Sequence, residues 1–192
     1  FEYACEEPTQ SAEEFRQNND PKHMFAEIDW ACDFMENAAK DKVPFFAYVS
    51  FHAVHTQWQA RKEYIEYFKN KPAGKLHDQP VYAGMIKHMD DAIGIVLKKV
   101  RDLGLSDNTI IIFTSDNGGV PSTSQAPLRG FKGSLYEGGI REPFYIHNPK
   151  FIKVGECDMP VAHVDIYPTV LDFAGGRPRK DYILDGVSLK PI

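Results

Sequence analysis

The sequence predicts an α/β fold in which a mostly parallel central sheet is flanked by helices. Residues 43–51 (VPFFAYVSF) and 109–114 (TIIIFT) are short, nearly continuous apolar runs rich in β-branched and aromatic side chains, which is typical of strands buried on both faces. Between them, residues 81–103 carry apolar side chains at helical spacing. This order of strand, helix and strand favours a β–α–β unit with parallel strands.

Residues 1–22 are polar and contain several turn-forming residues, so we expect a surface loop with a short helix near residues 11–17. Asp20 and Pro21 then provide an N-cap and a first-turn proline for an amphipathic helix over residues 22–40. Its apolar positions recur three and four residues apart: Phe25, Ile28, Cys32, Met35 and Ala39. Its acidic residues are interpreted as solvent-facing: Asp29, Asp33 and Glu36.

Two histidines, His52 and His55, follow the strand predicted over residues 43–51, in the motif FHAVHT. Ligands gather at the carboxyl ends of strands in open α/β sheets, so the pair is well placed for a site. The pattern alone favours the alternative, in which both are hydrogen-bonded loop residues. Residues 59–69 then predict a short helix. Nearby aromatic residues either pack against the protein, which is more common, or contact a substrate: Trp58, Tyr64 and Tyr67.

The helix over residues 81–103 ends at Gly104, which is a good C-terminal stop. It also carries His88, Asp90 and Asp91. Adjacent carboxylates on a helix point about 100° apart, so these two are poorly arranged for joint acid–base catalysis. We expect a structural role, with Asp90 or Asp91 accepting a hydrogen bond between the helix and a loop.

The strand over residues 109–114 runs into Asp116-Asn117-Gly118-Gly119. Carboxylate and amide oxygens are the ligands that hard cations such as calcium or magnesium prefer. Because Asn-Gly is also a strong turn signal, the residues alone leave a metal site and a simple polar turn equally open. Lys132 follows in a loop punctuated by glycines.

The C-terminal third predicts three shorter features. Residues 144–147 are expected to form a short strand, and Asp165 is expected to cap a helix over residues 166–174 that ends at Gly175 and Gly176. Residues 184–191 read as a turn followed by extended chain.

The composition limits the classes of protein to which this chain can belong. The 192 residues are 43% hydrophobic, which supports one domain with a sizeable core. A net charge of −5 gives no support for nucleic-acid binding, and no apolar run approaches the roughly 20 residues that a membrane helix needs. Cys32 is expected to be a buried thiol, whereas pairing of Cys5 with Cys157 is left open. The chain starts at Phe1 without an initiator Met, so we expect it to be a segment of a longer polypeptide.

Several blocks of the sequence, in the same order, resemble the sulfatase family of the alkaline-phosphatase-like superfamily. They are PFFAYVSFHAVHT, YAGMIKHMDDAIGIVLKKVRDLGLSDNTIIIFTSDNGG, PLRGFKGSLYEGGIREP and HVDIYPTVLDFAG. The resemblance runs over residues 44–192 and implies an alkaline-phosphatase-like fold, with the whole chain as a single partial catalytic domain. The family's nucleophile is a Cys converted to formylglycine in a C-x-P-S-R or C-x-A-x-R motif. Neither motif occurs in this sequence, and the surroundings of Cys5 (ACEEPTQ) do not match it.

The resemblance implies roles for four residues. Asp116 and Asn117 are implied calcium ligands, with the rest of the ligand set and the formylglycine expected N-terminal to Phe1. Lys132 matches the lysine of an RxGKG-type block that contacts the sulfate and the leaving oxygen. His55 matches the second histidine of an FHAPH-type motif that contacts the sulfate ester, although Val54 stands where proline is common. His52 is expected either to be structural or to support the site residues without touching the substrate. Arg129 and Arg141 are expected to be structural, by pairing with Glu137 or Glu142.

The activity implied by the resemblance is hydrolysis of a sulfate ester by a calcium-assisted formylglycine nucleophile that lies outside this chain. The implied partners are a sulfated small molecule or glycan as substrate and the missing N-terminal segment of the same domain. The family implies a periplasmic, secreted or lysosomal compartment. Two alternatives stay open: a phosphoesterase or phosphonate hydrolase of the same superfamily, and a catalytically inactive sulfatase-like fragment.

Overall fold

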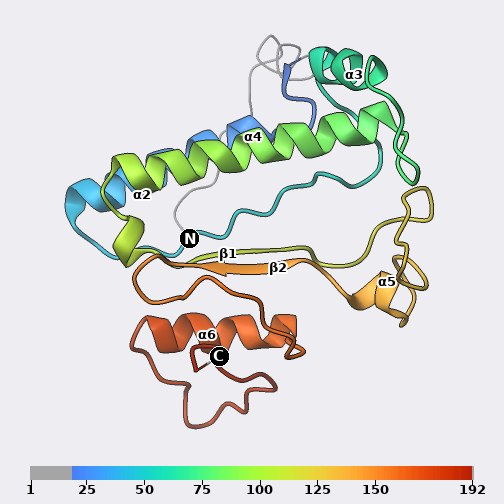
Figure 1. Cartoon of the computed structure of the whole chain (residues 1–192). Helices are drawn as coiled ribbons and strands as arrows, with labels where there is room; N and C mark the ends of the chain where they lie inside the picture. The colour runs from blue at the N-terminus through green and yellow to red at the C-terminus, as the bar shows by residue number, and fades with distance from the viewer. Residues whose placement is uncertain (1–18, 192) are drawn as a thin grey trace.

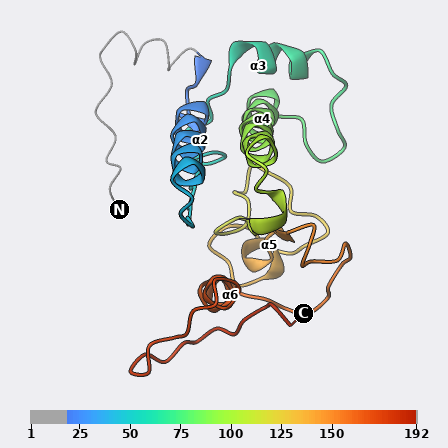
Figure 2. The same ribbon diagram turned by 90° about the vertical axis from the view of Figure 1, so that its left-hand side faces the viewer.

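The computed structural model describes residues 19–191 and arranges them in three layers (Figure 1). Helices α2 (Met24–Asp41), α3 (Lys62–Lys69) and α4 (Pro80–Asp102) form one layer. Strands β1 (Ile111–Thr114) and β2 (Phe144–His147) form the middle layer, and helix α6 (Ile166–Phe173) lies on the opposite side (Figures 1 and 2). The short helix predicted near residues 11–17 falls outside the described residues.

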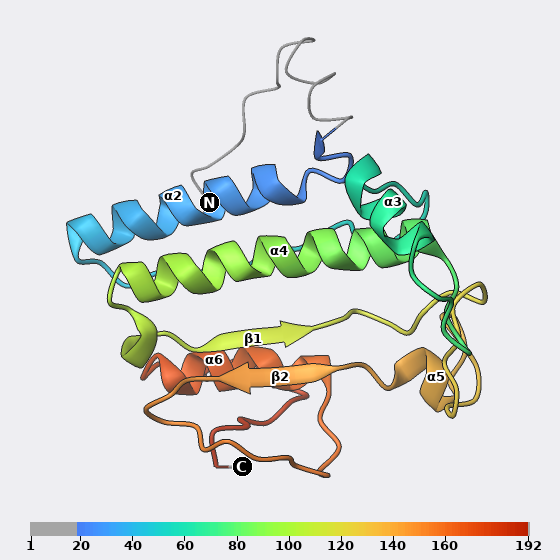
Figure 3. The same ribbon diagram turned by 45° about the horizontal axis from the view of Figure 1, so that its top comes forward.

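The apolar face of α2 is the one that the three-and-four spacing predicts. Met24, Ile28, Cys32 and Met35 are buried and form a core with Ala92 and Val100 of α4. The acidic residues on the other face, including Asp29 and Asp33, are exposed as expected. The two helices therefore hold each other through complementary apolar stripes, and α4 also contacts α3 (Figure 3).

The start of α2 is capped from a distance. Its N-cap residue, His23, has a left-handed backbone and makes no side-chain cap. The carboxylate of Asp20 accepts the Ala26 backbone N–H instead, at 2.9 Å. Asp20 thus satisfies one of the free amides in the first turn, although the helix begins two residues later than the sequence predicts.

Helix α4 begins at Pro80, one residue before the predicted start, and ends at Asp102, two residues before Gly104, the predicted stop. Gly104 has a φ of 69°, which is the left-handed conformation that ends many helices, and its N–H binds the Arg101 carbonyl. The predicted apolar stripe is only partly covered, because Met85, Ala92 and Val100 are buried while Ile86 is 43% exposed.

The segment 43–51 is extended, but the prediction that it forms a strand is wrong for this structure. It runs between α4 and β1 without pairing to a strand within the described part of the chain (Figure 1). Phe45, Val49 and Phe51 pack against the α2–α4 core, whereas Phe46 and Tyr48 are 61% and 81% exposed. This alternation is that of a strand with one covered face. A strand also needs a hydrogen-bonded neighbour, and none is present among residues 19–191.

Within residues 19–191 the sheet consists of β1 and β2 alone, and it is antiparallel. Ile111 pairs with His147 at one end and Thr114 with Phe144 at the other. The α/β class is confirmed, but the expected parallel pairing between residues 43–51 and β1 is not formed. The physical reason is separation, since both segments line a cavity of about 2490 Å³ instead of sharing a ladder.

The shorter elements complete the chain: η1 (Ser106–Asn108), α5 (Glu137–Ile140) and η2 (His163–Asp165). Asp165 occupies the N-cap position of α6, but its side chain does not make the capping hydrogen bond that the sequence predicts. Its two carboxylate oxygens accept the N–H groups of Ala162 and Val187, each at 2.8 Å, so it ties the turn before α6 to the C-terminal segment. None of the helices within residues 19–191 has the length and apolar character needed to cross a membrane.

Candidate active site

The four residues singled out from the sequence line one cavity. His55 comes from the loop after the extended segment, Asp116 and Asn117 follow β1, and Lys132 lies in the loop before α5. Arg141, Glu142 and His163 line the same cavity. The four residues, which span 77 positions of sequence from His55 to Lys132, thus line one large cavity of about 2490 Å³.

The turn after β1 is held by its own polar groups. The Asn117 side-chain amide donates to the Asp116 carboxylate at 2.6 Å, and the Ser115 hydroxyl donates to the Asn117 carbonyl at 3.1 Å. His163 donates from Nε2 to the Ser115 carbonyl at 2.7 Å. These bonds fix the direction in which the Asp116 and Asn117 side chains leave the strand.

The Lys132 loop is tied to this turn through the backbone. The Lys132 N–H binds the Gly119 carbonyl at 2.8 Å, and the Gly118 N–H binds the Gly139 carbonyl at 3.1 Å. A Cβ on Gly118 would lie 2.0 Å from the Gly138 carbonyl oxygen, so the close approach of the two loops requires glycine. The glycines of both motifs thus set the distance between Lys132 and the end of β1.

His55 is exposed, and its ring orientation is fixed by its neighbour. Nδ1 lies 2.7 Å from the Thr56 carbonyl oxygen, which only accepts, so Nδ1 carries the proton. The other nitrogen, Nε2, is the one left to act on a ligand. The His52 ring lies beside it, with 5.3 Å between ring centroids.

The oxygen ligands after β1 suit a hard cation in kind but not in number. Calcium takes six to eight oxygens, whereas Asp116 and Asn117 supply one carboxylate and one amide. No group of three or more His, Cys, Asp or Glu side chains within residues 19–191 converges on a point that could hold a metal ion. Within residues 19–191, Asp116 and Asn117 therefore do not make up a complete calcium site.

Two further cavity residues are Glu142, expected from the sequence only as a possible partner for Arg129 or Arg141, and His163, which had no assigned role. Oε1 of Glu142 is buried without a hydrogen-bond partner. Burial raises the pKa of this carboxyl, with Asp116 adding to the rise and His163 opposing it. The HVDIYPT block contains His163, but only the fold reveals its bond to the strand end.

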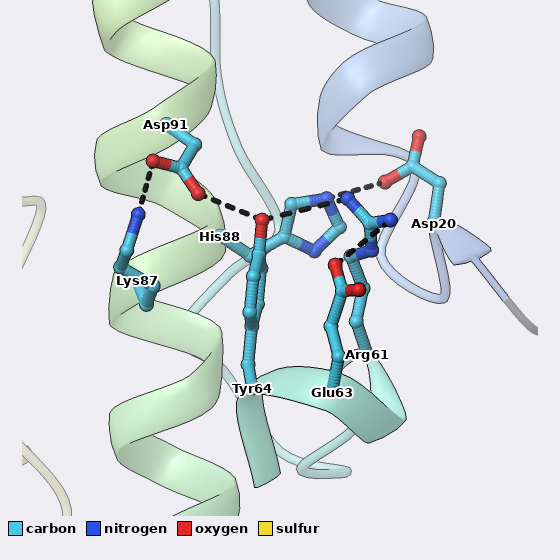
Figure 4. Close-up of polar contacts among 7 residues, drawn as sticks. All are labelled: Asp20, Arg61, Glu63, Tyr64, Lys87, His88 and Asp91. Carbon is cyan, nitrogen blue, oxygen red and sulfur yellow. Dashed lines mark hydrogen bonds and ion pairs between the residues drawn. The ribbon is translucent and has the colours of Figure 1, made fainter. Parts of the chain in front are cut away.

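Asp91 of α4 makes structural contacts, as expected for one of the two adjacent carboxylates (Figure 4). Asp91 accepts the Tyr64 hydroxyl at 2.7 Å and pairs with Lys87, so it joins α4 to α3 and not to a loop. His88 is fully buried, and its Nε2 lies 3.2 Å from Asp20 without the alignment of a good hydrogen bond. Burial lowers the pKa of His88, which favours the neutral ring.

The aromatic residues near α3 pack within the protein. Trp58 lies against Tyr82 with 5.3 Å between ring centroids, and Tyr67 lies against Phe68 at 5.1 Å. Tyr64 is part of the cluster around Asp91. The packing interpretation accounts for Trp58 and Tyr64, whereas Tyr67 remains 53% exposed.

The arginines of the Lys132 block behave differently from each other. Arg141 pairs with Glu137 at 3.3 Å, as expected. Arg129 instead stacks on Tyr136, with its guanidinium carbon 3.8 Å from the ring centroid.

An α/β domain with polar residues gathered where a strand ends belongs to the class that binds ligands at strand ends. Comparison with known proteins gives the family. The chain belongs to the sulfatase family, whose model matches residues 1–176. The fold is accordingly alkaline-phosphatase-like, as the resemblance implied.

Individual relatives agree with this assignment. A sulfatase of Formosa agariphila is 33% identical over 187 residues, which cover 90% of this chain and 34% of that protein. Arylsulfatase J of Mus musculus is 37% identical over 149 residues, or 76% of this chain and 24% of the relative. The solved structure of Ps i-CgsB in complex with k-i-k-neocarrahexaose superposes with a TM-score of 0.80 at 36% identity, over 88% of this chain and 37% of that one. The chain therefore spans about a third of the length of the relatives that it matches.

Proposed function

We propose that this chain is the central and C-terminal part of the catalytic domain of a sulfatase, and that the complete domain hydrolyses a sulfate ester carried by a glycan. One observation carries the proposal: His55, Lys132, Asp116 and Asn117 line a single cavity. The glycan is supported by the similarity to Ps i-CgsB, which was solved with a neocarrahexaose.

Lys132 supplies positive charge to an anionic substrate. A sulfate ester carries a negative charge, and further charge develops on the leaving oxygen as the ester bond breaks. A preorganised cation stabilises that charge. The backbone bond from Lys132 to Gly119 supports this role, since it anchors the lysine to the end of β1.

His55 contributes a proton-donating ring. With Nδ1–H donated to the Thr56 carbonyl, a second proton on Nε2 makes the ring an imidazolium that hydrogen-bonds the sulfate or protonates the leaving alkoxide.

Asp116 and Asn117 would hold calcium, which when bound neutralises the sulfate oxygens without needing a proton. The formylglycine nucleophile and the remaining calcium ligands are assigned to an N-terminal segment of the same domain. We place that segment in the cavity between residues 43–51 and β1. Its strands would cover Phe46 and Tyr48 and pair with backbone groups that have no ladder partner among residues 19–191.

The test is carried out on the protein purified from its source. A peptide map shows whether an upstream peptide carries a cysteine-derived aldehyde, and ion chromatography measures sulfate released from sulfated oligosaccharides. Lys132→Ala and His55→Ala should each lower kcat/KM by about 10²–10³-fold. Lys153→Ala, an exposed lysine outside the cavity, is the matched control and should be neutral.

Three outcomes would count against the proposal. Full sulfatase activity in Lys132→Ala and His55→Ala would remove both residues from the mechanism. Faster hydrolysis of a phosphate ester than of the matching sulfate ester would favour the phosphoesterase alternative. A purified protein with no aldehyde and no sulfate release would leave a catalytically inactive member of the family.

A further inference from the structure

Lys22 is a buried lysine at the start of the helical layer, and no role in the site has been assigned to it. Only 7% of its surface is exposed, and burial lowers the pKa of its ammonium group. Burying a lysine is unfavourable unless its charge finds a partner. Here Nζ donates to the backbone carbonyl of His55 at 3.2 Å, across 33 positions of sequence.

The backbone around Lys22 is held firmly on one side. Two residues earlier, the Asp20 carboxylate accepts the Ala26 N–H of α2 and lies against the buried His88 ring of α4 (Figure 4). The His88 ring in turn packs edge-on against Phe25, with 4.3 Å between centroids. Lys22 therefore extends from a segment anchored to two helices.

The loop on the other side has fewer anchors of its own. The His55 N–H binds the His52 carbonyl at 3.0 Å, and Nδ1 of the ring donates to the next carbonyl of the same loop. A second cavity, of about 350 Å³, lies beside this loop and is lined by Lys22, Glu27, His52, Gln57 and Gln59. The Lys22 bond thus joins the His55 loop to the helical layer next to open space.

We propose that Lys22 is a positioning residue for His55: its ammonium group fixes the His55 carbonyl, and through it the place of the His55 ring in the active site. The proposal rests on the proposed role of His55 in sulfate-ester hydrolysis. Lys22 touches neither substrate nor metal in this scheme and acts only through the loop.

The first experiment replaces the ammonium while keeping the apolar stem, as Lys22→Met, in the complete protein. Misplacing a catalytic group by about 1 Å costs on the order of 10²-fold, so kcat for sulfate release should fall by roughly 10–100-fold with little change in KM. Lys40→Met, at an exposed lysine of α2, is the matched control. Lys22→Gln gives the same readout if the Met variant is unstable.

The second experiment asks whether Lys22 acts through His55. In a His55→Gly background, Lys22→Met should cause no further loss of kcat, because coupled residues are non-additive. Propylammonium should partly restore kcat in Lys22→Ala by entering the 350 Å³ cavity, and should leave wild-type protein and Lys40→Met unchanged.

The possible outcomes distinguish a failure of the positioning role of Lys22 from a failure of the proposed role of His55. A folded Lys22→Met protein with wild-type kcat, or equal losses in the wild-type and His55→Gly backgrounds, would overturn the positioning role. Full activity in His55→Ala would instead overturn the role proposed for His55 itself. A loss in Lys22→Met that disappears in the His55→Gly background, together with rescue by the amine, is the expected result.

Discussion

The helical layer and the sheet side of this molecule differ in how their apolar surface is covered. Between α2 and α4, Met24, Ile28 and Met35 are at most 3% exposed. On the sheet side, Phe46 and Tyr48 stand 61% and 81% exposed beside a cavity of about 2490 Å³. One region is a closed core and the other is an open groove.

The polar groups do not follow the same division. In the helical layer, Asp91 accepts the Tyr64 hydroxyl and pairs with Lys87, which joins α3 to α4. Buried polar atoms without a hydrogen-bond partner among residues 19–191 nevertheless occur in both regions: both ring nitrogens of His88 in the helical layer and Oε1 of Glu142 on the sheet side. The two regions therefore differ in how their apolar surface is covered, and not in how completely their polar groups are paired.

The largest expected effect is a change in the free energy of unfolding, and it is tested by making the same change, isoleucine to alanine, once in each region. Ile28→Ala removes a side chain that is 1% exposed and should lower the free energy of unfolding by about 2–5 kcal/mol. Ile86→Ala, on the groove face of α4, should change it by only a few tenths of a kcal/mol, since alanine is the better helix former and little packing is lost. Urea unfolding of the 192-residue chain measures both.

The complete protein sharpens this comparison. If an N-terminal segment fills the cavity of about 2490 Å³, Ile86→Ala should clearly lower the free energy of unfolding of the complete protein. Ile28→Ala should lower it by the same amount as in the 192-residue chain. Equal costs for the two substitutions in the 192-residue chain would show that the groove is already packed.

The next largest expected effect on the free energy of unfolding comes from Asp20, which caps α2 and lies beside His88 of α4. Asp20→Ala removes the acceptor for the Ala26 N–H and leaves His88 without its charged neighbour, so we expect a loss of about 1–3 kcal/mol. Asp20→Asn keeps an acceptor oxygen and should cost much less at pH 8, where His88 is neutral. A loss in Asp20→Asn as large as in Asp20→Ala would assign the effect to charge and not to capping.

The sequence predicted the helical layer well because its signals are local. The spacing of Ile28, Cys32 and Met35 defines the buried face of α2, and Gly104 marks the end of α4. The antiparallel partner of β1 and the unpaired state of residues 43–51 were missed, since pairing depends on which other strands are present. An apolar run shows that a segment is suited to a sheet, but not whether a neighbour is available.

The site shows the same limit. Asp116, Asn117, Lys132 and His55 lie in short motifs and could be named from the sequence, and the structure places them around one cavity. Glu142 and His163 also lie in family-like blocks, but nothing in those blocks marks them as cavity residues, and Lys22 lies outside the blocks. The contacts of Lys22 and His163 join segments that lie far apart in the chain, since Lys22 bonds to His55 and His163 to Ser115.

A pH-dependent effect is expected at Glu27, at the border of the two regions. Burial, followed by repulsion from Asp20, raises the pKa of Glu27 to about 7 from its ordinary 4.5. The folded protein therefore holds this proton more tightly than the unfolded chain, and the resulting stability is full below about pH 4.5 and lost as pH rises through 7. Glu27→Gln should gain about 1–2 kcal/mol over wild type at pH 8, after allowing for partial exposure, and nothing at pH 4.5.

Urea unfolding at the two pH values measures this difference, with Asp29→Asn, at an exposed acidic residue of the same helix, as the control. If Glu27→Gln raises the free energy of unfolding as much at pH 4.5 as at pH 8, the stabilisation does not come from removing the charge of Glu27.

The smallest effect tests whether the polar cluster of the helical layer contributes to stability or only fills space. Tyr64→Phe removes the hydroxyl that Asp91 accepts at 2.7 Å and leaves the ring packed beside His88. Because Asp91 keeps its pair with Lys87, the loss should stay near the net value of one hydrogen bond, about 0.5–1.5 kcal/mol. Tyr145→Phe, at an exposed tyrosine of β2, is the matched change on the sheet side and should be neutral. If both variants unfold at the wild-type urea concentration, the cluster adds nothing beyond packing, and the contrast between the two regions rests on their apolar surfaces alone.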